Sequence, residues 1–91
     1  MNSADRKLWL VVLAGSARKS LKRIPPDDRA RVRLAIDAME ENPLLGDVRK
    51  LKGGQKGFRR RVGAWRVFFD IYPEERRVVV TAIARRTSTT Y

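Results

Sequence analysis

One stretch in the second half of the chain constrains the fold more than any other. Residues 58–72 read Phe-Arg-Arg-Arg-Val-Gly-Ala-Trp-Arg-Val-Phe-Phe-Asp-Ile-Tyr. Arginines alternate there with large apolar side chains, and a period of two is typical of strands that bury one face. Gly63 and Ala64 separate the two halves, and glycine at the first central position suits a type II′ turn, which requires a positive φ there. The stretch therefore predicts a β-hairpin.

The same alternation predicts which side chains share a face. In the second strand one face carries Trp65, Val67, Phe69 and Ile71, and the other carries Arg66, Phe68, Asp70 and Tyr72. The first strand places Arg59 and Arg61 together, with Arg60 on the opposite, core-facing side. We therefore expect Arg59, Arg61 and Arg66 to converge on one surface of a sheet.

An apolar run and a pair of prolines mark the first two elements. Residues 8–13, Leu-Trp-Leu-Val-Val-Leu, form a short continuous apolar run, which predicts a strand buried on both faces. Ser16 is a suitable N-cap for a short helix over residues 17–23. Pro25 and Pro26 end this helix, because the residue before a proline disfavours the α conformation.

A second helix and a final strand complete the prediction. The helix begins at Pro26 or Asp27 and is closed by Asn42-Pro43. Its apolar stripe consists of Val32, Ala35, Ile36 and Met39, widened by Leu34 and Ala38. Residues 44–55 are a linker by composition, and residues 77–83 form a continuous β-branched strand that we expect near the centre of the sheet.

The element order β-α-α-β-β-β describes an α+β domain, with two N-terminal helices packed on a small, largely antiparallel β-sheet. The 91 residues suffice for one domain with one core, which we expect to span residues 1–91. Trp9 and Trp65 stand in apolar strand patterns, so we expect both to pack in this core rather than to stack on a ligand.

The formal net charge of +11 indicates the class of partner. A small domain with this charge attracts polyanions, so nucleic acid is the first partner to consider. Contact with an acidic protein, or simply a soluble basic surface, would also account for the charge.

Missing residue types narrow the chemistry. The chain has no cysteine, which excludes disulfides and thiolate catalysis, and no histidine, which argues against a zinc site. Asp70, Glu74 and Glu75 have no further ligand type nearby, so we expect neither a metal nor a cofactor. The apolar run at residues 9–14 is too short for a membrane span or a signal-peptide core, and the expected location is the cytoplasm.

Five short motifs follow one another along the chain. They are Leu-x-x-Ile-Pro at residues 21–25, Asn-Pro at 42–43, Lys-Leu-x-Gly at 50–53, Phe-Arg-x-Arg-Val-Gly-x-Trp-Arg-Val at 58–67 and Ala-Arg-Arg at 84–86. In this order and spacing they resemble the RelE/ParE toxin superfamily, over nearly the whole chain from Leu8 to Arg86.

The resemblance implies a toxin of a type II toxin–antitoxin system. RelE-like members cleave mRNA in the ribosomal decoding site without a metal, by attack of the RNA 2′-OH on the adjacent phosphate. The products are a 2′,3′-cyclic phosphate and a 5′-OH. ParE-like members share the fold and poison DNA gyrase instead.

The resemblance also implies which residues act. The catalytic positions are Arg59, Arg61, Arg66, Arg86 and Tyr91, with Arg85 as second candidate for the position of Arg86. Because an arginine stays charged and is a poor general base, Arg59 and Arg61 are expected to act mainly as phosphate clamps. Arg66 is the expected transition-state contact, and one well-placed donor lowers such a barrier by about 2–4 kcal/mol.

Further contacts to RNA are expected around this centre. The nucleic-acid contacts are Lys52, Lys56, Arg59, Arg61 and Arg85. Arg86 could donate to the leaving 5′ oxygen or pair with Asp70, and we favour the first role. Tyr91 could stack on a base, which contributes about 1–3 kcal/mol.

Three functions therefore remain open. The first is a ribosome-dependent mRNA endonuclease, which Arg86 and Tyr91 favour. The others are a gyrase poison of the ParE type and a basic RNA-binding protein without catalysis. Under each of them we expect an acidic antitoxin that folds as it wraps the basic surface, giving a toxin–antitoxin hetero-oligomer.

Overall fold

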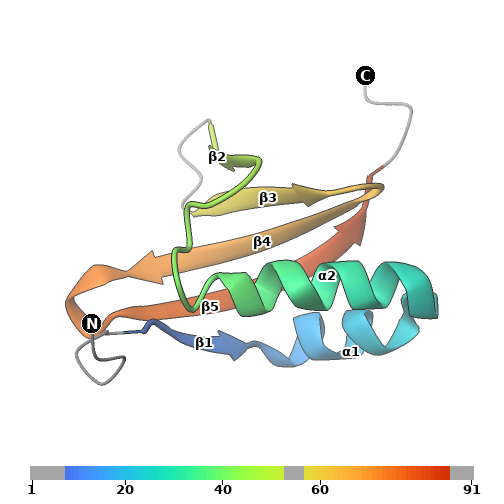
Figure 1. Ribbon diagram of the computed structural model, residues 1–91, viewed down its shortest axis with the longest axis horizontal. Coiled ribbons are helices and arrows are strands. Elements are labelled where there is room, and N and C mark those ends of the chain that lie inside the picture. Colours follow the sequence, from blue (N-terminus) through green and yellow to red (C-terminus); the bar gives the residue numbers. More distant parts are fainter. Residues whose placement is uncertain (1–7, 53–56, 87–91) are drawn as a thin grey trace, which may run out of the picture.

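The computed structural model describes residues 8–52 and 57–86, which fold into an α+β domain (Figure 1). In chain order the elements are β1 (Leu10–Leu13), α1 (Gly15–Arg23), α2 (Pro26–Ala38), β2 (Val48–Lys50), β3 (Phe58–Val62), β4 (Trp65–Tyr72), a short 3-10 helix (Pro73–Glu75) and β5 (Arg77–Arg85). No helix within these two ranges is long and apolar enough to cross a membrane.

The strands form one sheet in the order β1-β5-β4-β3-β2. All neighbours are antiparallel except β1 and β5, which run parallel. Both α-helices lie on the same face of the sheet (Figure 1). The predicted α+β class and the central position of the last strand are therefore confirmed.

Residues 48–50 correct the prediction of a linker over 44–55. They form β2, in which Val48 pairs with Arg60 and Lys50 with Phe58, so the sheet has one strand more than expected. A strand of three residues is too short to show a period of two, and only its partner β3 reveals it.

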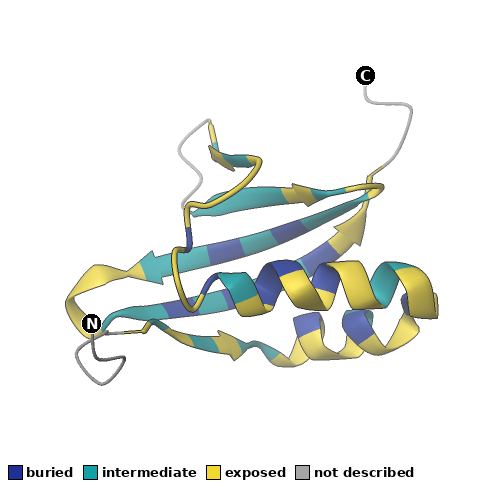
Figure 2. Ribbon diagram, in the orientation of Figure 1, coloured by how far each residue is buried: buried dark blue, intermediate teal, exposed yellow. Residues whose placement is uncertain are grey.

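The core lies between the two helices and the sheet (Figure 2). The helices contribute Ala17, Leu21, Ile24, Val32, Ala35, Ile36 and Met39, and the sheet contributes Val67, Phe69, Val78, Val80 and Ile83. The predicted stripe on α2 is confirmed except at Leu34, whose side chain is 70% exposed. Leu34 is two positions from both Val32 and Ile36, which at 100° per residue points it away from the buried face.

The first strand is not buried on both faces as predicted. β1 is an edge strand whose residues alternate, with Leu10 61% and Val12 37% exposed. Its other side chains and the preceding Trp9 are partly buried against the core. The prediction was wrong because a continuous apolar run does not show whether both faces of the strand are covered. The helices cover only one face of the sheet, so the other side chains of β1 stay exposed. The predicted core packing of Trp9 and Trp65 is confirmed.

Two predicted helix ends also move. The N-cap of α1 is Ala14 rather than Ser16, whose hydroxyl instead donates a 2.9 Å hydrogen bond to the carbonyl of Thr81 in β5. α2 begins at Pro26 as expected but ends at Ala38, one turn before Asn42. The side chain of Asn42 accepts a hydrogen bond from the backbone N–H of Leu44 and so organises the turn that follows.

Candidate nucleic-acid interface

The sheet face opposite α1 and α2 carries the arginines predicted to act, and we call it the open face. Its side chains are Arg49 from β2, Arg59 and Arg61 from β3, Arg66, Phe68, Asp70 and Tyr72 from β4, Arg77, Val79, Ala82 and Ala84 from β5, and Leu10 and Val12 from β1. Their direction follows from alternation, because Val67 and Phe69 are buried under the helices and their neighbours along β4 therefore point the other way.

The hairpin sets the register of this face. Gly63 has a φ of +58° and begins a two-residue turn, which brings Val62 opposite Trp65. Arg61 is consequently opposite Arg66, and Arg59 is opposite Phe68. The predicted convergence of the three arginines on one face is confirmed.

The structure adds two arginines that the sequence prediction did not assign to this face, Arg49 and Arg77. Arg49 in β2 lies directly opposite Arg59. The open face therefore carries two cross-strand arginine pairs, Arg49–Arg59 and Arg61–Arg66. Like charges directly opposite each other destabilise a sheet. The arrangement is therefore suited to binding an anion between the side chains.

A β-bulge shapes the space beside these pairs. Phe68 is opposite Ala82, but Phe69 is opposite Val80, so Thr81 is an extra residue in β5. Its hydroxyl donates a 3.2 Å hydrogen bond to the carbonyl of Phe68. In a regular strand Val80 and Ile83 would point to opposite faces, and the bulge lets both enter the core.

The bulge also leaves small side chains on the open face of β5. Ala82 lies beside Phe68 and Ala84 beside Arg66. Phe68 therefore lies beside Ala82 and Ala84 of β5 and opposite Arg59 of β3. Its neighbours on the same face of β4 are Arg66 and Asp70. The result is an apolar centre next to the arginines of the open face.

The arginines of the open face have free hydrogen-bonding capacity. The Nε atoms of Arg59 and Arg66 are inaccessible to solvent and have no hydrogen-bond partner. The ion pair Arg77–Glu75 lies at the far end of this face, beside Tyr72, and Arg33–Asp37 lies on α2. Neither pair includes Arg49, Arg59, Arg61 or Arg66. Guanidinium N–H groups that have no protein partner can donate hydrogen bonds to an anion such as a phosphate.

The remaining predicted residues lie in different places. The backbone N–H of Arg86 donates to the carbonyl of Ala64, which holds Arg86 beside the hairpin turn. Arg85 projects toward the helix side, with its guanidinium 5.8 Å from the ring centre of Trp65, so it does not join the open face. Lys52 is exposed at the end of the first described range, and Lys56 and Tyr91 lie outside the described residues.

Arg60 is on the core-facing side, as the alternation predicts. Its Nη1 donates a 2.8 Å hydrogen bond to the carbonyl of Leu45. The guanidinium lies against Gly46, where a Cβ would come within 2.5 Å of the Arg60 Cζ atom. Arg60 therefore fastens the segment before β2 to the sheet, and it takes no part in the open face.

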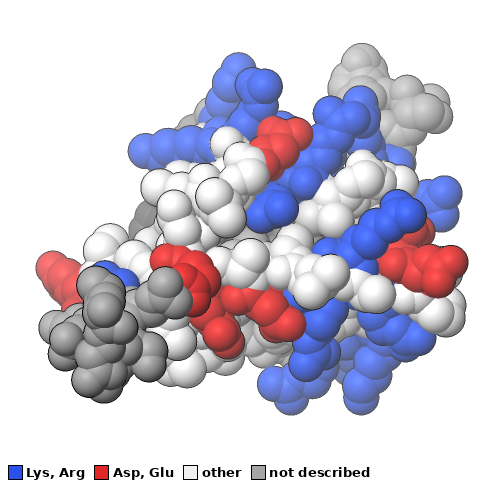
Figure 3. All heavy atoms as spheres, in the orientation of Figure 1, with Lys and Arg blue, Asp and Glu red and all other residues white. Residues whose placement is uncertain are grey.

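Charge is uneven on the helix side of the molecule as well. Lys and Arg gather over α1 and over the β2–β3 end, whereas Asp and Glu lie near both ends of α2 and at the turn between β4 and β5 (Figure 3). In the described part of the chain no three potential metal ligands among Asp, Glu, His and Cys lie together.

A model of the family described as "ParE toxin of type II toxin-antitoxin system, parDE" matches residues 11–89. The chain belongs to this family. A protein named toxin RelE1 from Methanocaldococcus jannaschii is 30% identical over 71 residues, which cover 75% of this chain and 79% of the relative. The resemblance to the RelE/ParE superfamily is thus confirmed, and the protein is a toxin of a toxin–antitoxin system.

Solved structures of RelE and ParE-like toxins share the fold. In the RelE–RelB complex of Pyrococcus horikoshii, the matched chain has a TM-score of 0.79 and 23% identity, covering 89% of this toxin and 98% of that chain. A chain of the toxin–antitoxin complex RelBE2 of Mycobacterium tuberculosis has a TM-score of 0.76 and 25% identity, and the match covers 87% of this toxin and 99% of that chain. The YoeB/ParE toxin of Agrobacterium tumefaciens has a TM-score of 0.71 and 19% identity, and the match covers 86% of this toxin and 99% of that chain.

Proposed function

We propose that this toxin is a ribosome-dependent mRNA endonuclease that inhibits translation in the cytoplasm. The observation that carries the proposal is the pair of cross-strand arginine contacts on the open face, Arg49–Arg59 and Arg61–Arg66, placed around the ring of Phe68. A phosphate between such side chains relieves their repulsion, and a partly exposed ring such as that of Phe68 can stack on a base. Single-stranded RNA offers both groups.

The proposed reaction is a transesterification that needs no metal. The 2′-oxygen of one nucleotide attacks the adjacent phosphorus, and the bond from phosphorus to the 5′-oxygen breaks. Charge accumulates on the equatorial oxygens, where Arg66 and Arg61 act as fixed donors. Arg59 holds the phosphate, and Arg86, beside the hairpin turn, donates a hydrogen bond to the leaving 5′-oxygen. Tyr91 stays a predicted base-stacking residue.

The test is expression of the toxin under tight control, with the 5′ ends of cellular mRNA mapped afterwards. We expect cuts at defined positions within codons. Arg66→Ala should abolish them and relieve growth arrest, because it removes the transition-state contact without touching the core. Arg31→Ala is the matched control, since it removes an exposed arginine of α2 on the other side of the molecule.

The matched family is named for ParE, which makes DNA gyrase the second candidate target. That function predicts stabilised gyrase–DNA cleavage complexes and DNA-damage signalling with intact mRNA. Salt-sensitive RNA binding with no toxicity would instead indicate a basic binding protein. Either result would refute the endonuclease proposal.

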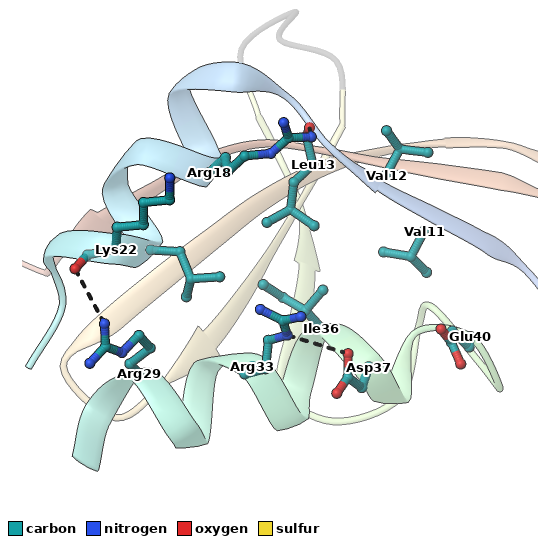
Figure 4. A pocket seen from close by; sticks show the side chains of 11 residues that line it. Val11, Val12, Leu13, Arg18, Lys22, Arg29, Arg33, Ile36, Asp37 and Glu40 are labelled. Atoms are coloured by element: carbon teal, nitrogen blue, oxygen red, sulfur yellow. Dashed lines mark hydrogen bonds and ion pairs between the residues drawn. The ribbon is translucent and has the colours of Figure 1, made fainter. Parts of the chain in front are cut away.

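We also propose an acidic cognate antitoxin. The related toxins of Pyrococcus horikoshii and Mycobacterium tuberculosis were solved in complexes with theirs. Here a hollow of about 680 Å³ lies between β1, α1 and α2 (Figure 4). Its apolar residues are Val11, Val12, Leu13, Leu21 and Ile36, its basic residues are Arg18, Lys22, Arg29 and Arg33, and its acidic residues are Asp37 and Glu40. Arg33 is paired with Asp37, so the excess of basic charge lies with Arg18, Lys22 and Arg29. An acidic, amphipathic segment would match these three residues and the apolar floor.

Two lysines of α1 allow a matched test of this contact. Lys22 lines the hollow, whereas Lys19 is exposed on the same helix and does not. The probe is the small acidic protein expected from the neighbouring reading frame. Lys22→Ala should weaken its binding more than Lys19→Ala does, and equal effects would place the contact elsewhere.

A further inference from the structure

The proposed endonuclease reaction leaves one chemical step without a residue. The 2′-hydroxyl must lose a proton when its oxygen attacks phosphorus, and the arginines of the open face cannot accept it, because a guanidinium stays protonated. A side chain that can take a proton must therefore lie within reach of the phosphate that these arginines hold. The following inference rests on the proposed function.

We infer that Asp70 is the proton acceptor, in a subsite that it forms with Arg59 and Phe68. Asp70 lies in β4 two residues after Phe68, and so on the same open face about 7 Å further along the strand. Among the carboxylates of the described residues it is the only one within a strand. The others belong to α2, to the 3-10 helix or to the segments between elements.

The carboxylate of Asp70 has a defined position. A Cβ built on Gly57, the residue that precedes β3, would come within 2.5 Å of Asp70 Oδ1 and 2.9 Å of the Phe69 carbonyl. Asp70 Oδ1 therefore lies directly over the Gly57 backbone, and only glycine leaves room for it. Gly57 also has a φ of +98°, which side chains other than glycine rarely adopt.

The carboxylate of Asp70 has no hydrogen-bond or ion-pair partner within residues 8–52 and 57–86. Asp70 itself is half-buried. Two arginines lie diagonal to Asp70 in the register: Arg59, opposite Phe68, and Arg77, opposite Tyr72. Arg77 is already paired with Glu75, whereas Arg59 is in none of the ion pairs described above. Diagonal neighbours on antiparallel strands are about 7–8 Å apart, which is within reach of a long side chain.

The three residues together provide the parts of a cleavage subsite. A phosphate above the ring of Phe68 is reached by Arg59 from across the strand pair and by Arg66 from two residues before. The ribose 2′-hydroxyl on the other side then faces Asp70. The proton passes from the 2′-oxygen to Asp70 as the bond to phosphorus forms, and Asp70 afterwards releases it to water. The leaving 5′-oxygen takes its proton from water while Arg86 hydrogen-bonds to it.

Asp47 provides a matched control for this assignment. It precedes β2 at the edge of the sheet, and its backbone carbonyl accepts a hydrogen bond from the N–H of Arg61. Its side chain is exposed. Asp47 is therefore the same chemical group beside the same arginines, but it lies at the far edge from Phe68. Replacing it by asparagine changes the net charge as much as replacing Asp70 does.

The experiment is single-turnover cleavage of a short mRNA on purified ribosomes by the full-length toxin. Asp70→Asn should slow cleavage by about 100-fold or more, the range typical of a lost general base. Its affinity for the mRNA–ribosome complex and its melting temperature should stay close to those of the wild type. Asp47→Asn should cleave at nearly the wild-type rate, and Asp70→Glu, which keeps a carboxylate, should recover part of the loss.

Three results would overturn the inference. The first is cleavage by Asp70→Asn at the wild-type rate. The second is an equal loss of cleavage rate in Asp47→Asn and Asp70→Asn. The third is a loss of rate in Asp70→Asn that is explained by weaker binding or by unfolding, with no recovery in Asp70→Glu. The proposed function fails in a different way, because the wild-type toxin itself would then leave the mRNA uncut. The two failures are thus distinguishable in one assay.

Discussion

A single hydrogen bond connects the start of β4 to the helix layer, and its removal should be measurable. The indole Nε1–H of Trp65 donates to Asp28 Oδ2 at 3.0 Å, in a partly buried contact between residues 37 positions apart. Trp65 directly precedes Arg66, and its ring also carries the guanidinium of Arg85. The contact therefore anchors the strand end that presents Arg66.

The magnitude follows from two contributions. A hydrogen bond to a charged group contributes about 1.5–3 kcal/mol, and an acidic residue in the first turn of a helix adds about 0.3–1 kcal/mol. Asp28 makes both contributions, because it lies in the first turn of α2. Asp28→Ala should lower the free energy of unfolding by about 2–3 kcal/mol, which lowers the melting temperature of a domain this size by about 10–15 °C.

Asp27 is the matched control for this variant. It lies in the same first turn of α2 and is exposed, with no contact to Trp65. Asp27→Ala should therefore lose only the contribution from the helix dipole, about 0.5 kcal/mol. The difference between the two variants isolates the hydrogen bond.

The assay is urea unfolding followed by far-ultraviolet circular dichroism, which does not depend on tryptophan. A double-mutant cycle with Trp65→Phe should give a coupling free energy of about 1–2 kcal/mol. Equal losses for Asp27→Ala and Asp28→Ala, or a coupling near zero, would refute the reasoning. The structural link between α2 and the arginine strand would then contribute nothing to stability.

Two further predictions concern the backbone and the charge of the open face. Gly57→Ala should lower the free energy of unfolding by about 1–3 kcal/mol in the same urea assay, because it strains a positive φ and displaces Asp70; Gly15→Ala, where a Cβ meets nothing within 4 Å, should cause no such loss, and equal effects would contradict the argument. Arg49→Ala should reduce the slope of log K against log salt for RNA binding by about 1, as expected for one lost phosphate contact. Arg31→Ala should leave that slope unchanged, and a shared decrease would mean that RNA does not select the open face.

Much of the site could be predicted because its pattern is local. The hairpin at Gly63 and the common face of Arg59, Arg61 and Arg66 follow from alternation over adjacent residues, and the structure confirms both. The stripe on α2 follows from helical periodicity in the same way. Such patterns need no knowledge of distant neighbours, since each residue's direction is set by the residues beside it.

The predictions that were wrong or incomplete concern residues whose surroundings are set by segments far away in the sequence. The prediction of β1 as a fully buried strand was wrong because nothing in residues 8–13 tells whether the strand lies in the centre or at the edge of a sheet. Arg49 was missed because the three residues of β2 become a strand only when they pair with β3. Ser16 was assigned to the helix end, but its hydroxyl reaches Thr81, a residue 65 positions later.

The amino-acid sequence by itself thus determined the basic character of this toxin, its hairpin and the arginines that share one face. Only the tertiary structure decided what surrounds them. The bulge at Thr81 turns Ala82 toward Phe68, and the close approach of Gly57 sets the position of the Asp70 carboxylate. Both depend on the register between strands, which arises from packing of the whole sheet against the helices and is not encoded in any one stretch.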